Sequence, residues 1–94
     1  MTRAWVAEVV VMPKTGVNDP AGEAILGGLH DLGYRAVSKV RAGKQFHVEI
    51  AADDEAAARK TVSELADRVL ANPVIESFEI ERLAPVPMLA ENDR

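Results

Sequence analysis

The sequence predicts an α+β domain in which two helices cover one face of a four-stranded antiparallel sheet. Three observations support this prediction. Four segments of strand length are β-branched or alternate between apolar and polar residues, two longer segments carry apolar residues at helical spacing, and turn residues separate them. The chain has 94 residues, which suits one small domain, and 48% of these are hydrophobic, as in folded proteins.

The first predicted strand, residues 4–12 (AWVAEVVVM), is apolar on both of its faces. Alternation places Trp5, Ala7, Val9 and Val11 on one face and Val6, Val10 and Met12 on the other. Two helices cover only one face of a sheet, so we expect a second copy or a partner to cover the other. The candidate residues for this oligomer face are Trp5, Val6, Val9, Val10, Val11 and Met12.

The first predicted helix comprises residues 20–32. Asp19 supplies an oxygen for the unpaired backbone N–H groups of the first turn, and Pro20 suits the first helical position. Gly33 suits the left-handed position that follows a helix. One apolar stripe results, formed by Ala21, Ile25, Leu29 and Leu32.

A β-hairpin is predicted next, with strands at residues 35–41 and 45–51 and a tight turn at Ala42-Gly43. In the second of these strands Phe46, Val48 and Ile50 alternate with polar residues, which gives a period of two. We expect a positive φ at Gly43, as tight hairpin turns require.

The second predicted helix begins at Asp53-Asp54 and ends before Asn72-Pro73, since acidic residues favour a helix start and proline stops its continuation. Its expected buried stripe consists of Ala58, Val62, Leu65 and Val69. Residues 74–83 form the fourth predicted strand. The domain therefore spans residues 1–83, and we expect residues 84–94, with two prolines, to be loose or to lie on a neighbouring chain. The order β-α-β-β-α-β is that of the ferredoxin-like fold.

Composition excludes several classes of function. The net charge of −4 disfavours general binding to nucleic acid, because an acidic chain repels phosphate groups. The absence of Cys excludes disulfides, thiolate metal sites and thiol nucleophiles. The apolar run of residues 4–12 is too short to span a bilayer and no cleavage site follows it, so we expect a cytoplasmic protein without a membrane partner.

Three segments resemble the PurS family, the small accessory subunit of formylglycinamidine ribonucleotide synthetase (phosphoribosylformylglycinamidine synthase). Residues 17–22 (VNDPAG) resemble the family's helix-opening V-x-D-P-Q-G, residues 40–44 (VRAGK) its V-R-x-G-K hairpin, and residues 70–76 (LANPVIE) its L-L-A-N-x-V-I-E segment. They follow the family's order and separations, and the resemblance covers residues 4–83. Ala21 replaces the usual Gln and Asn18 a common apolar residue, so a partner contact through that amide would be missing here.

The resemblance implies a ferredoxin-like, non-catalytic subunit that forms dimers or tetramers. Such subunits associate with the synthetase PurL and the glutaminase PurQ, in a complex of the EC 6.3.5.3 type that works in purine biosynthesis. The complex converts formylglycinamide ribonucleotide, glutamine and ATP into formylglycinamidine ribonucleotide, glutamate, ADP and phosphate. The implied role of the small subunit is to bridge the two partners for ammonia transfer, with ATP and Mg²⁺ used by the complex and no cofactor in this subunit.

Arg41, Gly43 and Lys44 are the candidate partner-docking residues, because two cations beside a turn suit an acidic surface. The alternatives are a phosphate cradle, which lacks the spacing of a P-loop, and a simple basic hairpin. The motif residues Asp19, Pro20, Gly22, Asn72 and Pro73 are explained by capping and close packing, and we expect a structural role for them.

No catalytic or metal site is predicted. His47 and Glu49 lie on one strand face, but two ligands do not make a metal site and no third is evident. His30 lies near a helix end, where an imidazolium is favourable. The serines have no His at a motif spacing.

Three other kinds of protein share this element order. A ligand-binding regulatory module of the ACT type is the main alternative, with Thr15-Gly16 as the turn after the first strand. An acylphosphatase-like enzyme would need an arginine in the loop after that strand, where this chain has only Lys14. An RNA-binding RRM would need an aromatic pair where this chain has Phe46 alone.

Overall fold

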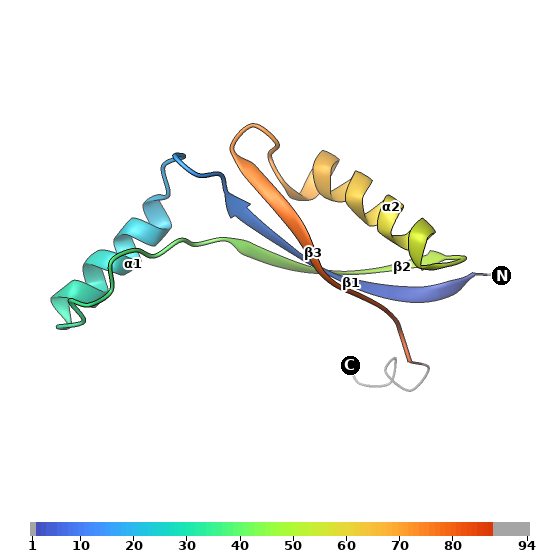
Figure 1. Ribbon diagram of the computed structural model, residues 1–94, viewed down its shortest axis with the longest axis horizontal. Helices are drawn as coiled ribbons and strands as arrows, with labels where there is room; N and C mark the ends of the chain where they lie inside the picture. The colour runs from blue at the N-terminus through green and yellow to red at the C-terminus, as the bar shows by residue number, and fades with distance from the viewer. Residues whose placement is uncertain (1, 88–94) are drawn as a thin grey trace.

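The computed structural model describes residues 2–87 of the chain (Figure 1). Two helices and an antiparallel sheet confirm the α+β, ferredoxin-like class, with one strand fewer than predicted. The elements in chain order are β1 (Arg3–Pro13), α1 (Pro20–Asp31), β2 (Lys44–Ala52), α2 (Glu55–Leu65), the π-helical turn η1 (Ala66–Leu70) and β3 (Glu76–Pro85).

The sheet has the order β2-β1-β3, and both outer strands run antiparallel to β1. Val9 lies opposite Phe46 on β2, and Val11 lies opposite Phe78 on β3, so apolar residues of all three strands share one face. The β1–β3 register shifts between Glu8 and Val9. β1 is the central strand of the sheet.

Helix α2 covers one face of the sheet and creates the core. Val9 and Val11 of β1 and Val62 of α2 are fully buried there. The indole Nε1 of Trp5 donates a hydrogen bond of 3.1 Å to the carbonyl oxygen of Ala52. Trp5, Ala7, Val9 and Val11 therefore face α2, so that Trp5, Val9 and Val11 are core residues and lie away from the open face of the sheet.

The last turn of the second helix corrects the predicted buried stripe. Ala58 and Val62 are buried as expected, whereas Val69 is 77% exposed. Ala66 is also buried, at the same four-residue spacing that separates Ala58 from Val62. In the π-helical turn η1 the Ala71 N–H donates to the Ala66 carbonyl, five residues back, so Ala71 rather than Val69 is the next residue to reach the core. The N-terminal end is as predicted, since the Asp54 carboxylate accepts a hydrogen bond of 2.8 Å from the Ala57 N–H.

Helix α1 begins and ends as predicted but does not lie on the sheet. The Asp19 carboxylate accepts from the Gly22 N–H, Pro20 opens the helix, and Gly33 takes a φ of +99°. Residues 14–43, here called the arm, project beyond the end of the sheet (Figure 1), and α1 makes no extensive contact with any strand. The predicted apolar stripe is consequently open to solvent, with Ile25 49% and Leu32 76% exposed.

The predicted hairpin at Ala42-Gly43 is open in this structure. Residues 37–43 form neither helix nor strand, and the chain continues directly into β2 rather than folding back on it (Figure 1). Gly43 does not take the positive φ that the predicted turn requires. Two contacts hold the segment open: the Ala42 N–H donates to the Asp19 carboxylate, and the Arg41 guanidinium donates to the Pro13 carbonyl.

The sheet also includes the start of the predicted tail. β3 continues to Pro85, and the Val86 N–H donates a hydrogen bond of 2.9 Å to the carbonyl of Ala4. Residues 84–86 thus belong to the domain, and residues 88–94 lie outside the described residues. None of the helices in residues 2–87 is long and apolar enough to cross a membrane.

Candidate functional site

The three sequence segments singled out above meet where the arm joins the sheet, a region here called the neck. It is built from the end of β1 with the start of α1, from residues 40–44, and from the turn of residues 71–76 before β3. Residues far apart in the sequence are thereby brought together. Lys14 and Pro73, for example, are 59 positions apart, yet the Lys14 ammonium donates to the Pro73 carbonyl at 2.6 Å.

Asp19 fastens the start of α1 to the returning chain. One carboxylate oxygen accepts a 3.0 Å hydrogen bond from the Gly22 N–H, and the other accepts a 2.9 Å bond from the Ala42 N–H. The bonds from Ala42 and Gly22, followed by the nearby Arg41 guanidinium, hold the pKa of Asp19 below its ordinary value of 3.8. The carboxylate form of Asp19 is therefore the one that the arm requires.

Two glycines permit close backbone approaches in the neck. A Cβ on Gly22 would lie 2.3 Å from the Val40 carbonyl oxygen, and one on Gly43 would lie 2.3 Å from both the Met12 sulfur and the Val11 carbonyl oxygen. Neither glycine has a positive φ, so space rather than conformation demands glycine here. Gly43, predicted as a docking residue, is thus placed as a packing residue.

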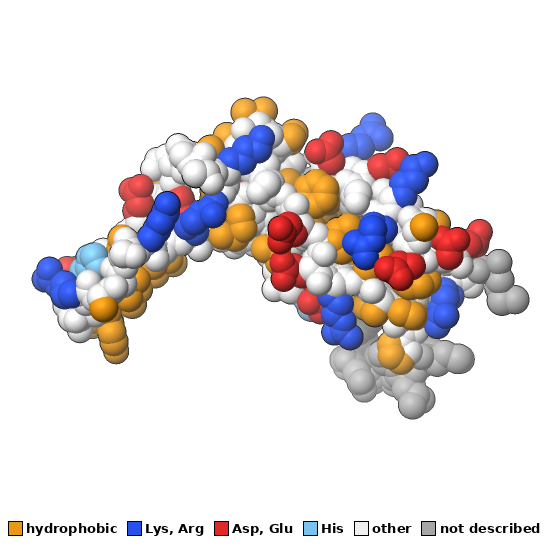
Figure 2. Space-filling view, viewed as in Figure 1, with side chains coloured by type: hydrophobic (Ala, Val, Ile, Leu, Met, Phe, Trp, Pro, Cys, Tyr) orange, Lys and Arg blue, Asp and Glu red, His pale blue; other side chains and the backbone are white. Residues whose placement is uncertain are grey.

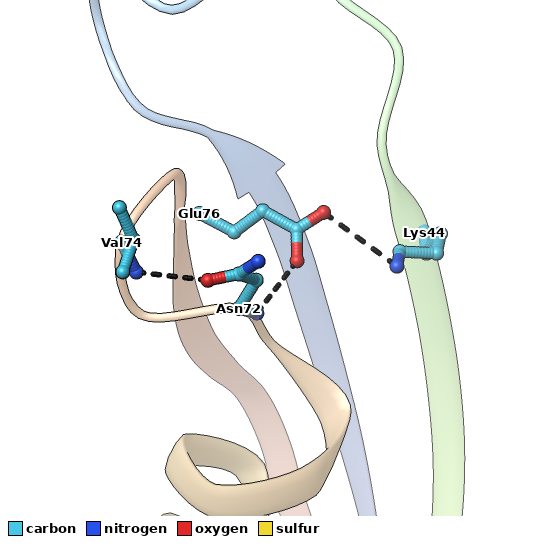
Figure 3. A network of polar contacts seen from close by, with 4 residues as sticks. All are labelled: Lys44, Asn72, Val74 and Glu76. Carbon is cyan, nitrogen blue, oxygen red and sulfur yellow. Dashed lines mark hydrogen bonds and ion pairs between the residues drawn. The ribbon is translucent and has the colours of Figure 1, made fainter.

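Glu76 links the turn before β3 to the start of β2 (Figure 3). One of its carboxylate oxygens accepts a 2.8 Å hydrogen bond from the Asn72 N–H, and the other lies 3.5 Å from the Lys44 ammonium. The Asn72 side chain in turn accepts a 3.0 Å bond from the Val74 N–H. Asn72 and Glu76 therefore hold this turn together, and Pro73 lies within it.

The predicted docking cations are positioned by the neck itself. Arg41 donates to the Pro13 carbonyl, and Lys44 pairs with Glu76 while 55% of its side chain stays exposed. Both contacts leave part of each cation facing solvent, so docking through Arg41 and Lys44 stays a prediction. Lys14, which sequence reasoning did not single out, is a further cation of this region.

The returning segment gives the arm a positive side. Residues 35–44 (RAVSKVRAGK) contain four cations and no acidic residue, although the whole chain carries a net charge of −4. Figure 2 shows Lys and Arg side chains along the arm, whereas acidic and basic side chains alternate over the sheet and α2. A cavity of about 600 Å³ lies between the turn of residues 15–18 and residues 38–41, and Lys39 and Arg41 line it.

The open face of the sheet presents a narrow apolar strip. Val6, Val10 and Met12 of β1 are half-buried there without a covering helix. Charged residues flank them, including Glu8 and Arg82, whose side chains form a 3.7 Å ion pair. Of the six residues predicted for the oligomer face, these three remain on an accessible surface.

The two histidines have structural contacts. His30 Nε2 lies 2.7 Å from the Val37 carbonyl oxygen and so ties the end of α1 to the returning segment, a contact that sequence reasoning missed. His47 Nε2 lies 3.3 Å from Gln45 Nε2 on the exposed side of β2. Within residues 2–87, no group of three or more His, Cys, Asp or Glu side chains is arranged to hold a metal ion.

The fold and the neck define a small α+β domain, in which polar residues join a projecting arm to the end of a sheet that one helix covers. Comparison with known proteins gives the family. Residues 6–84 match the family described as "PurS: Phosphoribosylformylglycinamidine (FGAM) synthase", and the chain belongs to the PurS family.

Individual relatives agree with this assignment. The chain is 40% identical to the phosphoribosylformylglycinamidine synthase subunit PurS of Synechocystis sp., over 86% of this chain and 81% of the relative. It is also 40% identical to the subunit PurS of Archaeoglobus fulgidus, over 80% of this chain and 94% of the relative.

Solved structures share the fold. Thermus thermophilus PurS has a TM-score of 0.79 at 33% identity, covering 89% of this chain and 99% of that one. A chain in the structure of PurLQS from Thermotoga maritima has a TM-score of 0.75 at 29% identity, covering 88% of this chain and 98% of that one. Because these matches span nearly the whole chain, they extend over the arm as well as the sheet.

Proposed function

We propose that this chain is the non-catalytic assembly subunit of a multi-subunit FGAM synthase in purine biosynthesis. The observation that carries the proposal is the match over 88% of the chain to a structure of PurLQS, together with the family match over residues 6–84. The geometry supports a role in holding segments together, because the polar residues of the neck bind backbone groups of three separate parts of the chain.

The proposed role is to bridge a PurL-like synthetase and a PurQ-like glutaminase, so that ammonia released from glutamine reaches the synthetase before it escapes. In this proposal the complex uses ATP and Mg²⁺, and this subunit holds neither. The chain associates with itself as a dimer or tetramer and works in the cytoplasm. Its surfaces available for these contacts are the exposed stripe of α1, the half-buried strip around Val10 and the positive side of the arm.

The docking role of Arg41 and Lys44 is part of the proposal. Both cations sit at the junction of arm and sheet, and positive charges that are partly exposed there suit recognition of carboxylates on a partner surface. Replacing both with Glu leaves the core untouched and should weaken binding to the synthetase. Unchanged binding of the folded double variant would remove the neck from the docking surface.

Reconstitution tests the assembly role directly. Glutamine-dependent FGAM formation should require this chain together with the PurL and PurQ homologues. With ammonium salt in place of glutamine, the synthetase alone should turn over, because no ammonia transfer is then needed. Equal glutamine-dependent rates with and without the chain would refute the proposal.

A ligand-binding regulatory module is the second candidate. The cavity of about 600 Å³ beside Thr15 and Gly16 favours it, because the turn after the first strand is where ACT-type modules hold ligands. Calorimetry with amino acids and nucleotides distinguishes the two functions. Tight binding of an amino acid that depends on this turn would support the regulatory module.

A further inference from the structure

We propose that the cavity at the base of the arm binds a nucleoside 5′-monophosphate. The cations Lys14, Lys39 and Arg41 hold its phosphate, and its base packs against the apolar part of the cavity lining. A volume of about 600 Å³ suits such a ligand, since small-molecule sites span roughly 300–1,000 Å³. The inference goes beyond the assembly role and does not depend on it, because residues of a single chain form the cavity.

Three positive charges from distant parts of the sequence meet at this cavity. Lys14 follows β1, whereas Lys39 and Arg41 belong to the returning segment. The Lys14 ammonium donates to the carbonyl of Pro73, and the Arg41 guanidinium donates to that of Pro13. These carbonyls carry no net charge, so neither cation is neutralised, and Lys39 has no partner among the described residues. A phosphate group, with about two negative charges and three acceptor oxygens, suits three such donors better than a singly charged carboxylate does.

This arrangement differs from the phosphate cradle that the sequence left open at Arg41, Gly43 and Lys44. In the structure Gly43 is a packing residue and Lys44 is held in an ion pair. Neither of them lines the cavity, where Lys14 and Lys39 join Arg41 instead. The cations that face one cavity therefore come from two segments of the chain and not from one hairpin.

Two carboxylates also line the cavity and limit what it accepts. Both oxygens of Asp19 accept backbone hydrogen bonds, from Gly22 and Ala42, so this carboxylate is already satisfied. Glu23 is exposed and has no partner in the part of the chain that the structure describes, which leaves it free to accept from ribose hydroxyl groups. Three cations against two carboxylates keep the cavity positive, which favours an anion over a zwitterion such as an amino acid.

The apolar part of the lining distinguishes a nucleotide from a simple anion. It consists of Val17, Leu26 and Val40, and each of these side chains is half-buried. They come from the turn before α1, from α1 itself and from the returning segment. A base that packs against them removes apolar surface from water, whereas inorganic phosphate leaves that surface exposed.

Calorimetry on the full chain tests the ligand class, with adenosine 5′-monophosphate (AMP) as the probe. AMP should bind, whereas adenosine, which lacks the phosphate, and inorganic phosphate, which lacks the base, should each bind at least about tenfold more weakly. Adenosine as tight as AMP would exclude the role of the cations, and inorganic phosphate as tight as AMP would exclude that of the apolar lining. Either result, tighter binding of an amino acid, or no heat from AMP at millimolar concentration would overturn the proposal.

Removing one charge tests the cations. Lys39→Gln changes an exposed side chain that has no partner among the described residues, so the fold should be kept while AMP binds at least about tenfold more weakly. Lys60→Gln is the matched control, because Lys60 is exposed on α2 and does not line the cavity. AMP should bind this control as tightly as the unmodified chain. An equal loss in both variants would indicate general attraction to positive charge and would overturn the site.

A second pair of variants tests the apolar lining. Leu26→Ala should weaken AMP and leave inorganic phosphate unchanged, because it removes only apolar contacts. Ile25→Ala in the same helix is the control, since Ile25 is exposed and does not line the cavity. If Leu26→Ala left AMP binding unchanged, or weakened both probes equally, the placement of the base would be wrong.

Amide chemical shifts of the unmodified chain locate the site without any substitution. Saturation with AMP should shift the amides of residues 14–18 and 38–41 and leave those of α2 in place. Shifts centred on α2 or on the open face of the sheet would overturn the cavity as the site. Because no other subunit is present in these measurements, their failure would leave the assembly role untouched, and reconstitution tests that role separately.

Discussion

Substituting Gly22 with alanine tests the geometry of the neck. The added Cβ would lie 2.3 Å from the Val40 carbonyl oxygen and 2.5 Å from an Asp19 carboxylate oxygen, whereas ordinary contacts begin near 3.4 Å. The returning segment must therefore move by about 1 Å. Such a shift lengthens the bond from the Ala42 N–H to Asp19, now 2.9 Å, beyond hydrogen-bonding distance.

The expected cost follows from two opposing effects. Overpacking of a close backbone contact costs about 1–3 kcal/mol. Alanine in a helix is favoured over glycine by about 0.5–1 kcal/mol, which offsets part of that cost. We expect Gly22→Ala to lower the free energy of unfolding by about 1–2 kcal/mol.

Gly27 provides the matched control in the same helix. A Cβ there would meet nothing within 4 Å, so Gly27→Ala should raise stability by up to about 1 kcal/mol through helix propensity alone. Urea unfolding at one fixed protein concentration measures both variants, because self-association makes stability depend on concentration. If Gly22→Ala proved as stabilising as Gly27→Ala, the close approach of α1 to Val40 would be wrong.

Three further predictions test the core, the neck and its charge. Val62→Ala should cost about 2–3 kcal/mol in urea unfolding because Val62 is fully buried, whereas Val69→Ala, at an exposed position, should change stability by less than about 0.5 kcal/mol. Lys44→Glu should lower the free energy of unfolding by up to about 1 kcal/mol, because it breaks the ion pair with Glu76. The double variant Lys44→Glu with Glu76→Lys should recover part of that loss. Equal stability of the two variants would show that the ion pair contributes nothing. Because folding lowers the pKa of Asp19, its contribution to stability is present above pH 3.8 and is lost as the pH falls below that value. Asp19→Asn should therefore reduce the fall in the free energy of unfolding at acidic pH. The same fall in both proteins would contradict the contacts assigned to Asp19.

Local signals in the sequence predicted most of the elements. Helix starts were recoverable because a cap and its acceptor lie within three residues, as Asp19 with Gly22 and Asp54 with Ala57 show. Three short sequence segments were also enough to predict the family, which the match over residues 6–84 confirms. The predicted stripe of α2 was wrong at its end, since nothing nearby in the sequence marks the π-helical turn that buries Ala71 instead of Val69.

The open hairpin was beyond prediction for a physical reason. A closed hairpin and an open, extended run satisfy the same strand pattern, so residues 35–51 alone do not choose between them. The choice depends on Asp19, which lies 23 positions before its partner Ala42. The neck was equally hidden, because the contact of Lys14 with Pro73 leaves no local pattern.

The projecting arm also changes how the molecule behaves hydrodynamically. The chain measures 54 × 32 × 18 Å with a radius of gyration of 17.2 Å, whereas a compact chain of this length has a radius of roughly 12 Å. A single copy in this shape would elute from a sizing column ahead of its true mass. Elution volume alone will therefore overestimate how many chains are present.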